Sequence, residues 1–159
     1  MTKENDYQYL YSAFEATLQQ DLPKEVHLTN LCAMLRKQFN LFWAGFYTRV
    51  SENELRLWLY QGDLPCFRIA LGKGLCGRAA HSGQSQISMD VTKESNYIAC
   101  HSESRSELVV PGMVDGVCQF VMDLDHESIS FFDDTDIFWM EKIVGLVVKH
   151  QLIAQEWNI

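Results

Sequence analysis

The sequence is poor in positive charge and has no long apolar run. Its 159 residues carry 13 Lys and Arg against 21 Asp and Glu, which gives a net charge of −8. A nucleic-acid-binding protein needs a basic face against the phosphates, so this class is excluded. The longest apolar stretch, near 143–148, is far too short to span a bilayer, and the polar N-terminus lacks the apolar region of a signal peptide. We therefore expect a cytoplasmic protein with neither a nucleic-acid nor a membrane partner.

The cysteines lack the features of a stapled fold or a zinc centre. There are five, an odd number, and none shows the paired C-x₂-C spacing that zinc sites usually have. We therefore expect reduced thiols at rest and no metal ion. The sequence also lacks internal repeats, low-complexity tracts and long linkers, so residues 1–159 are interpreted as a single domain. Hydrophobic residues make up 47% of it, enough for one core.

The periodicity of apolar residues predicts the order of secondary structure. Helical spacing is present over 7–18 and 26–39, and alternation follows over several shorter segments. The predicted strands cover 41–50, 54–60, 66–71, 86–91, 107–114 and 117–125, with a short helix within 72–83, an irregular loop over 92–105 and a last helix capped by Asp133 or Asp134. Hairpin connections at 51–53 and at Asp115-Gly116 favour an antiparallel sheet. The prediction is an α+β fold, with about six antiparallel strands, flanking N- and C-terminal helices, and helices packed on one face of the sheet.

Two predictions concern which side chains face the core. In the second strand, Leu55, Leu57 and Leu59 should share one face because strand side chains alternate. In the last helix, the predicted buried face consists of Ile137, Phe138, Met140, Ile143, Val144 and Val147. Cys32 and Cys118 lie within helix and strand patterns and are interpreted as core residues.

Three cysteines lie in turn-like segments, where thiols can be reactive. Cys66 follows a break at Gly62 to Pro65, Cys76 lies among glycines, and Cys100 precedes a polar run. A thiol reacts as the thiolate, which nearby positive charge or a helix start favours. His101 follows Cys100 and could lower its pKa, although adjacent side chains often point apart. If two of these cysteines meet, the fold holds a nucleophile and a thiol that resolves its oxidised form.

Acidic and aromatic side chains supply a second candidate site. Asp123 and Asp125 should share one face of an apolar strand, and Glu107 opens the strand that pairs with it. Three convergent carboxylates would suit an α-amino group, and one of them would have a raised pKa. The alternative is that all three are solvated charges at strand ends. On the first strand, Trp43 and Tyr47 should flank Gly45, which leaves room for a small apolar ligand group; ordinary core packing is the alternative.

These motifs, taken together, resemble the free methionine-(R)-sulfoxide reductases, which are single GAF-type domains. The matching stretches are 43–47 (WAGFY), Gln61-Gly62 with Cys66, 72–77 (GKGLCG), 97–100 (YIAC), 106–111 (SELVVP) and 123–125 (DLD). They keep the family's order and run from about Phe42 to the last helix.

The resemblance implies a role for each matched residue. Cys100 would attack the sulfoxide sulfur, Cys66 would resolve the sulfenic acid, and Cys76 would be a second recycling thiol. Glu107, Asp123 and Asp125 would bind the substrate amino group and polarise or protonate the sulfoxide oxygen, while Trp43 and Tyr47 would enclose the methyl-sulfur end. The substrate would be free methionine sulfoxide and the reductant thioredoxin, with no metal or organic cofactor. A homodimer is possible through the strand that holds Trp58 and Tyr60.

Four positions depart from the family pattern, and a second function is compatible with the sequence. The departures are Asp63, Pro65, Phe120 and His126, where family members usually have Lys, Ala, Gly and Ser. The alternative function is a GAF module that binds a small ligand or senses redox state without catalysis.

Overall fold

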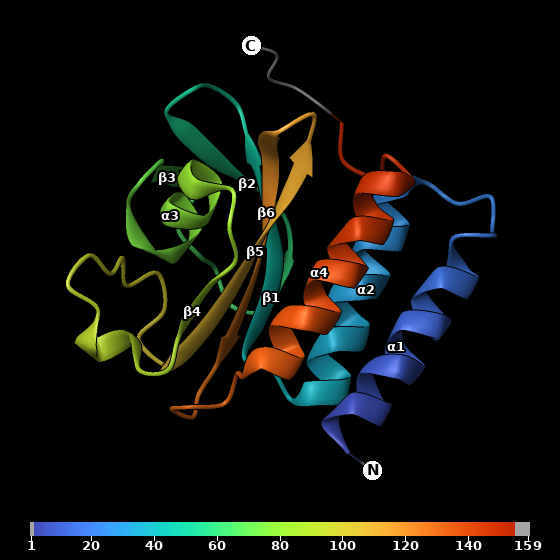
Figure 1. Cartoon of the computed structure of the whole chain (residues 1–159), viewed down its shortest axis with the longest axis horizontal. Helices are drawn as coiled ribbons and strands as arrows, with labels where there is room; N and C mark the ends of the chain where they lie inside the picture. The colour runs from blue at the N-terminus through green and yellow to red at the C-terminus, as the bar shows by residue number, and fades with distance from the viewer. Residues whose placement is uncertain (1, 155–159) are drawn as a thin grey trace.

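The computed structural model describes residues 2–154 and contains a six-stranded sheet with helices against it (Figure 1). The helices are α1 (Lys3–Thr17), α2 (Lys24–Phe39), α3 (Gly74–Ser82) and α4 (Asp134–Lys149), and the strands are β1 (Trp43–Arg49), β2 (Glu54–Gln61), β3 (Arg68–Ala70), β4 (Gln86–Ser88), β5 (Ser106–Val114) and β6 (Val117–His126). The strand order is β3-β2-β1-β6-β5-β4, and every neighbouring pair is antiparallel. The predicted α+β fold, with antiparallel strands and helices at both ends of the chain, is confirmed.

Helices α2 and α4 cover one face of the sheet, and α1 packs on the outer side of these two helices, so that the three enclose the larger core (Figure 1). The start of α4 is fixed by a capping box between Asp133 and Asp136, in which the Asp136 carboxylate accepts a hydrogen bond from the Asp133 amide at 2.7 Å and the Asp133 side chain accepts from the Asp136 amide. Buried Asp136 ties this helix to α1, because it accepts from the Tyr7 hydroxyl at 2.8 Å and lies 2.6 Å from the Lys3 ammonium. The prediction that Asp133 or Asp134 caps the helix is confirmed at Asp133.

Helix α3 confirms the short helix predicted within 72–83, but it lies on the opposite face of the sheet, so the prediction that all helices pack on one face was wrong. It covers a second, smaller cluster of buried side chains together with the segment that follows β4 (Figure 1). Gly77 allows α3 to lie close to the end of β3, because a Cβ at this position would lie only 2.3 Å from the Ala70 carbonyl oxygen. The helices therefore form layers on both sides of the sheet, and this second layer holds the candidate site.

Two predictions of buried faces were wrong in part. The pairing of β1 with β2 shifts register between Gly45 and Tyr47, so β2 carries an extra residue there. Leu55 and Leu57 consequently pack on the α3 side, whereas Leu59 packs on the side of the larger core. In α4, Phe138 is 53% exposed, and the neighbouring Trp139 is buried in its place. Cys32 and Cys118 are buried, as predicted.

The β5–β6 hairpin forms at the predicted turn. Asp115 and Gly116 have φ angles of 50° and 79°, the left-handed pair that a tight two-residue hairpin requires. The turn pairs Val114 with Val117 and Met113 with Cys118, and a β-bulge between Gly112 and Met113 then shifts the register by one residue, so that Glu107 lies opposite Asp125. The turn and the bulge together therefore position two of the candidate acids.

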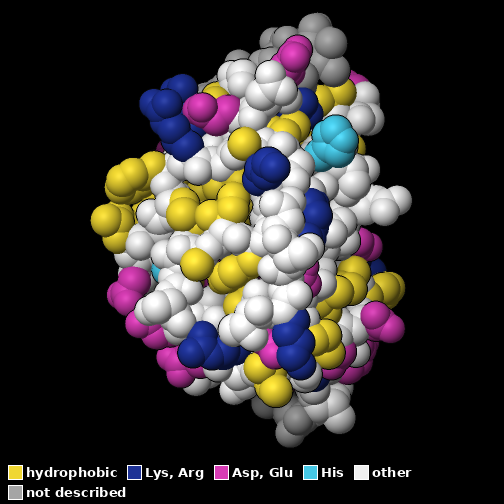
Figure 2. Space-filling view, turned by 90° about the vertical axis from the view of Figure 1, so that its left-hand side faces the viewer, with side chains coloured by type: hydrophobic (Ala, Val, Ile, Leu, Met, Phe, Trp, Pro, Cys, Tyr) yellow, Lys and Arg dark blue, Asp and Glu magenta, His cyan; other side chains and the backbone are white. Residues whose placement is uncertain are grey.

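The surface over α3 shows no continuous basic area among the described residues. Apolar, acidic and basic side chains are interspersed on this face (Figure 2). Over residues 2–154, no helix has both the length and the apolar character needed to cross a bilayer.

Candidate active site

A narrow cavity of about 20 Å³ lies between α3, the segment after β4 and the sheet. Its lining includes Cys76, Cys100, His101, Glu107, Asp123 and Asp125. The fold therefore brings two of the three candidate cysteines and all three candidate acids to one cavity. The space is enough for about one water molecule.

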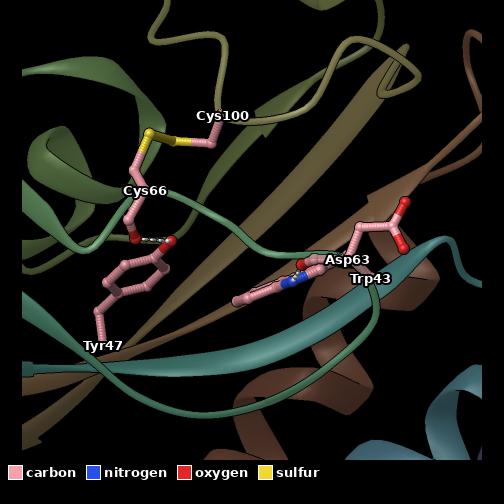
Figure 3. Close-up of a disulfide and its surroundings, with 5 residues drawn as sticks. All are labelled: Trp43, Tyr47, Asp63, Cys66 and Cys100. Carbon is pink, nitrogen blue, oxygen red and sulfur yellow. Dashed lines mark hydrogen bonds between the residues drawn. A yellow bond between two sulfur atoms is a disulfide. The ribbon is translucent and has the colours of Figure 1, made fainter.

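The third candidate cysteine, Cys66, is joined to Cys100 by a disulfide (Figure 3). The two Cα atoms are 5.2 Å apart, although 34 positions separate the residues in sequence. Two aromatic side chains of β1 hold the segment that carries Cys66. The Tyr47 hydroxyl donates a hydrogen bond to the Cys66 carbonyl oxygen, and the Trp43 indole N–H donates to the Asp63 carbonyl oxygen, both at 3.1 Å. This pairing of thiols makes Cys66 the partner of Cys100 in the oxidised protein.

The three acids share the face of the sheet that α3 covers. Asp123 and Asp125 lie opposite Gly45 and Trp43 of β1, and residues directly opposite in a sheet point to the same side. Glu107, Asp123 and Asp125 are only 7%, 6% and 3% exposed. They are therefore not solvated charges at strand ends, and that alternative is wrong. We call these three residues the acid cluster.

Burial and mutual repulsion keep protons on the acid cluster. Burial, followed by the charges of Asp123 and Asp125, raises the pKa of Glu107 well above its ordinary value. Burial, followed by the Asp125 charge, does the same to the pKa of Asp123. Burial raises the pKa of Asp125 to about 7, and a hydrogen bond donated by the Ser104 hydroxyl opposes that rise. The cluster can therefore donate a proton near neutral pH.

Cys76 faces the acid cluster from the first turn of α3. The sequence predicted a reactive thiol in this glycine-rich turn, and a helix start normally favours a thiolate. Burial and the charge of Asp123 instead raise the pKa of the Cys76 thiol well above its ordinary value. Cys76 is only 4% exposed and is not part of the disulfide. In this conformation it is a protonated thiol and a poor nucleophile.

The aromatic residues of β1 leave less room than the sequence suggested. Gly45 was predicted to leave space for a ligand group, but the Trp43 ring fills that space: a Cβ on Gly45 would lie 2.4 Å from it. The ring stacks on Tyr60, with 5.6 Å between the centroids. Neither Trp43 nor Tyr47 lines the cavity, so their contact with a substrate stays a prediction.

His101 lines the cavity but offers little positive charge to a thiolate. Its ring packs edge-on against Phe42 at 5.2 Å and lies 5.6 Å from the Trp43 ring. Burial lowers its pKa, which favours the neutral imidazole at neutral pH. The geometry therefore gives no support to a role for His101 in lowering the pKa of Cys100.

Sequence reasoning missed several residues in the segment that covers the cavity. Tyr97 and Ile98 line it, and Ser104 is 1% exposed and donates to Asp125. A would-be Cβ on Gly74 lies 3.3 Å from Ile98, so this glycine admits the covering segment. The sequence here has little periodicity, and the family resemblance included Tyr97 and Ile98 in the stretch 97–100 without assigning them a role.

The four departures from the family pattern lie outside the cavity lining. Asp63 contributes its backbone carbonyl to the Trp43 contact, and Pro65 is buried in the same loop. Phe120 packs in the larger core over Gly112, where a Cβ would lie 2.1 Å from its ring. His126 stacks on Phe131 with 3.7 Å between the ring centroids. These substitutions leave the arrangement of thiols and acids intact.

No family model matches the chain, but individual proteins do. It is 38% identical over 146 residues to GAF domain-containing protein A of Dictyostelium discoideum, covering 92% of each chain. It is 34% identical over 157 residues to the free methionine-R-sulfoxide reductase of Saccharomyces cerevisiae, covering 94% of this chain and 87% of that one. Among solved structures, it superposes with a TM-score of 0.89 and 35% identity on the Neisseria meningitidis free methionine-R-sulfoxide reductase in complex with its substrate, covering 94% and 90% of the two chains.

Proposed function

This chain belongs to the free methionine-R-sulfoxide reductase family of enzymes, and we propose that it reduces free methionine-(R)-sulfoxide through Cys100 and Cys66. The observation that carries the proposal is the Cys66–Cys100 disulfide beside a buried acid cluster. A thiol reductant needs such a pair of sulfurs, and a sulfoxide oxygen needs a proton before it can leave.

The proposed reaction uses the thiol and the acids together. The Cys100 thiolate attacks the sulfoxide sulfur while the acid cluster protonates the oxygen. The oxygen passes to the cysteine sulfur, so methionine is released and Cys100 becomes a sulfenic acid. The Cys66 thiol then displaces that oxygen as water and forms the disulfide. In sum, one sulfoxide and two thiols give methionine, a disulfide and water.

Substrate selection follows from the charge of the acid cluster. A free amino acid carries an ammonium group, which ionised carboxylates bind and which a methionine within a peptide lacks. Of the three acids, Asp125 has a pKa of about 7 and is partly ionised at neutral pH, and its burial makes this contact strong because a desolvated charge gains more from its partner. Trp43 and Tyr47 are proposed to enclose the methyl-sulfur end after the covering segment moves. The preference for the R epimer is proposed from the family alone.

The present conformation corresponds to the oxidised enzyme after turnover. Its cavity of about 20 Å³ is far smaller than the pockets of roughly 300–1,000 Å³ that usually hold small ligands. Breaking the disulfide would release the segments that carry Cys66 and Cys100, and the cavity could then open. We propose that thioredoxin supplies the two electrons, because its low potential suits this exchange. We also propose that the protein is a single domain and acts in the cytoplasm, where thioredoxin keeps thiols reduced.

Two further points stay proposals. Cys76 could act as a second recycling thiol, but only after it leaves its buried place beside the acids.

A homodimer could form through β2. Strand β3 pairs with only the first part of β2, at Glu54 to Arg56, and Trp58 in the part beyond is 42% exposed.

A coupled assay tests the proposal against the alternative of a non-catalytic GAF sensor. The protein is mixed with thioredoxin, thioredoxin reductase and NADPH, and NADPH oxidation is followed after addition of free methionine-(R)-sulfoxide. The S epimer and N-acetylmethionine sulfoxide are the controls, because the latter lacks the ammonium group. We expect turnover with the free R epimer only. If the free R epimer binds tightly but causes no NADPH oxidation, the result would favour the alternative of a non-catalytic GAF sensor.

A further inference from the structure

We propose that Cys76, Glu107 and Asp123 form a binding site for zinc or another thiophilic divalent cation, and that the bound ion inhibits the enzyme. The three residues come from α3, β5 and β6, and they lie far apart in the sequence. For this reason no ligand spacing could reveal the site. The inhibition rests on the proposed function, whereas the binding does not.

The geometry of the three side chains is close to that of a zinc site. One ligand atom from each residue, the Cys76 sulfur and a carboxylate oxygen from each acid, lies within 4.8 Å of the other two. Around a tetrahedral zinc ion with ordinary bond lengths, sulfur and oxygen ligands are about 3.4 to 3.6 Å apart. Side-chain rotations that move each ligand atom by about 1 Å therefore bring the three atoms to bonding distance from one ion. Water from the cavity can fill the fourth position.

An unpartnered oxygen points independently to a missing ligand. Oδ1 of Asp123 is buried, with the residue only 6% exposed, and no donor meets hydrogen-bond geometry with this oxygen, although the Cys76 thiol and Glu107 lie close enough to interact with the Asp123 carboxyl group. A buried oxygen without a well-placed donor is costly, and a cation that displaces the protons of these groups removes this cost. Arg78 follows Cys76 on the same helix, but its guanidinium is paired with Glu94 at 3.0 Å. The cavity of about 20 Å³ beside these groups is large enough for a single ion or water.

The mixed donor set selects the class of metal. A cysteine sulfur with two carboxylates suits zinc and cadmium, because magnesium and calcium prefer sites made only of oxygen ligands. The Cys66 and Cys100 sulfurs are not among the ligands. The site should therefore persist when those two cysteines are joined in the disulfide, as they are in this structure.

A bound ion would compete with the substrate for the acid cluster. It would occupy two of the three carboxylates proposed to bind the ammonium group and to protonate the sulfoxide oxygen. It would also hold Cys76 and prevent it from acting as a recycling thiol. Inhibition should therefore decrease as methionine sulfoxide concentration rises, and a chelator should reverse it.

Cadmium binding to the oxidised protein tests the site without any need for activity. With Cys66 and Cys100 joined, Cd²⁺ is titrated and the ultraviolet absorption of the cadmium–thiolate bond is recorded. We expect one ion per chain and a clear absorption band. Cys76→Ser should lose the band, and Asp123→Asn, which keeps the thiol, should weaken binding about tenfold or more. Cys118→Ser is the matched control, because Cys118 is a buried free thiol outside the cavity.

Each outcome decides the proposal. The absence of a band in the oxidised wild-type protein would overturn it, as would a band of full size in Cys76→Ser or the loss of the band in Cys118→Ser. Thermal unfolding of each variant shows that it is folded. The coupled assay separates this result from the proposed function: cadmium binding without reductase activity would refute the function alone, and activity without cadmium binding would refute the metal site alone.

Discussion

Replacing Asp125 by asparagine should stabilise the folded protein at pH 8 while it slows the reduction of methionine sulfoxide. Burial raises the pKa of Asp125 from its ordinary 3.8 to about 7. The folded state therefore binds more protons than the unfolded state between these values, and stability is lost as the pH rises from about 4 to about 7. A shift of about three pKa units corresponds to a cost of at most ~4 kcal/mol above pH 7.

Asparagine removes this cost because it has no charge, and its amide oxygen can still accept from Ser104. The neighbouring acids share the cost of ionisation, so we expect the free energy of unfolding to rise by about half of that upper bound, ~2 kcal/mol. For a chain of this size that raises Tm by about 4–8 °C. At pH 4 the gain should be small, since the carboxyl group is protonated in the folded state and only about half ionised in the unfolded state, whose pKa is the ordinary 3.8.

Thermal unfolding at pH 4 and pH 8 measures the effect, with Asp21→Asn as the control because Asp21 is exposed. The same variant should lose at least about tenfold in kcat/KM, or ~1.4 kcal/mol of transition-state stabilisation. An Asp125→Asn protein with unchanged stability at pH 8 and full activity would refute the interpretation of the acid cluster.

Three other predictions concern the thiols, the acids and the packing of β1. Cys66→Ser should release about one methionine per enzyme and then stop without thioredoxin-driven turnover; sustained cycling, measured by NADPH oxidation, would assign the resolving role to Cys76. The single-turnover rate, followed by rapid quench, should fall above pH 7, because the cluster must be protonated to donate and the pKa of Asp125 is about 7; a rate that rises steadily to pH 9 would exclude the cluster as the proton donor. Gly45→Ala should lower stability by about 1–3 kcal/mol, because its Cβ would lie 2.4 Å from the Trp43 ring. Gly145→Ala, on an open face of α4, should instead raise stability by about 0.5–1 kcal/mol, and urea unfolding measures both variants.

Local signals predicted the parts of the site that depend on strand geometry. Alternation in β6 indicated that Asp123 and Asp125 share a face, and the Asp115-Gly116 signal indicated the β5–β6 hairpin. These two features follow from one strand or one turn, where sequence and geometry are tightly linked. The bulge between Gly112 and Met113, which no signal in the sequence indicated, is also needed to bring Glu107 opposite Asp125.

Contacts between distant segments could not be predicted in the same way. The register shift in β2 adds a residue without any glycine or proline to mark it, so Leu59 changed faces. The Trp43 ring lies over Gly45 because Tyr60 stacks on it from the next strand. The protonated state of Cys76 depends on acids from two other strands that approach α3 only after folding.

The most direct test of the central claim is to map the disulfide formed in one turnover. The fully reduced protein is mixed with one equivalent of free methionine-(R)-sulfoxide, thiols are blocked, and the peptides are analysed by mass spectrometry together with the released methionine. The account predicts stoichiometric methionine and a bond between Cys66 and Cys100. Methionine formed together with a Cys76–Cys100 bond, or no methionine at all, would contradict it.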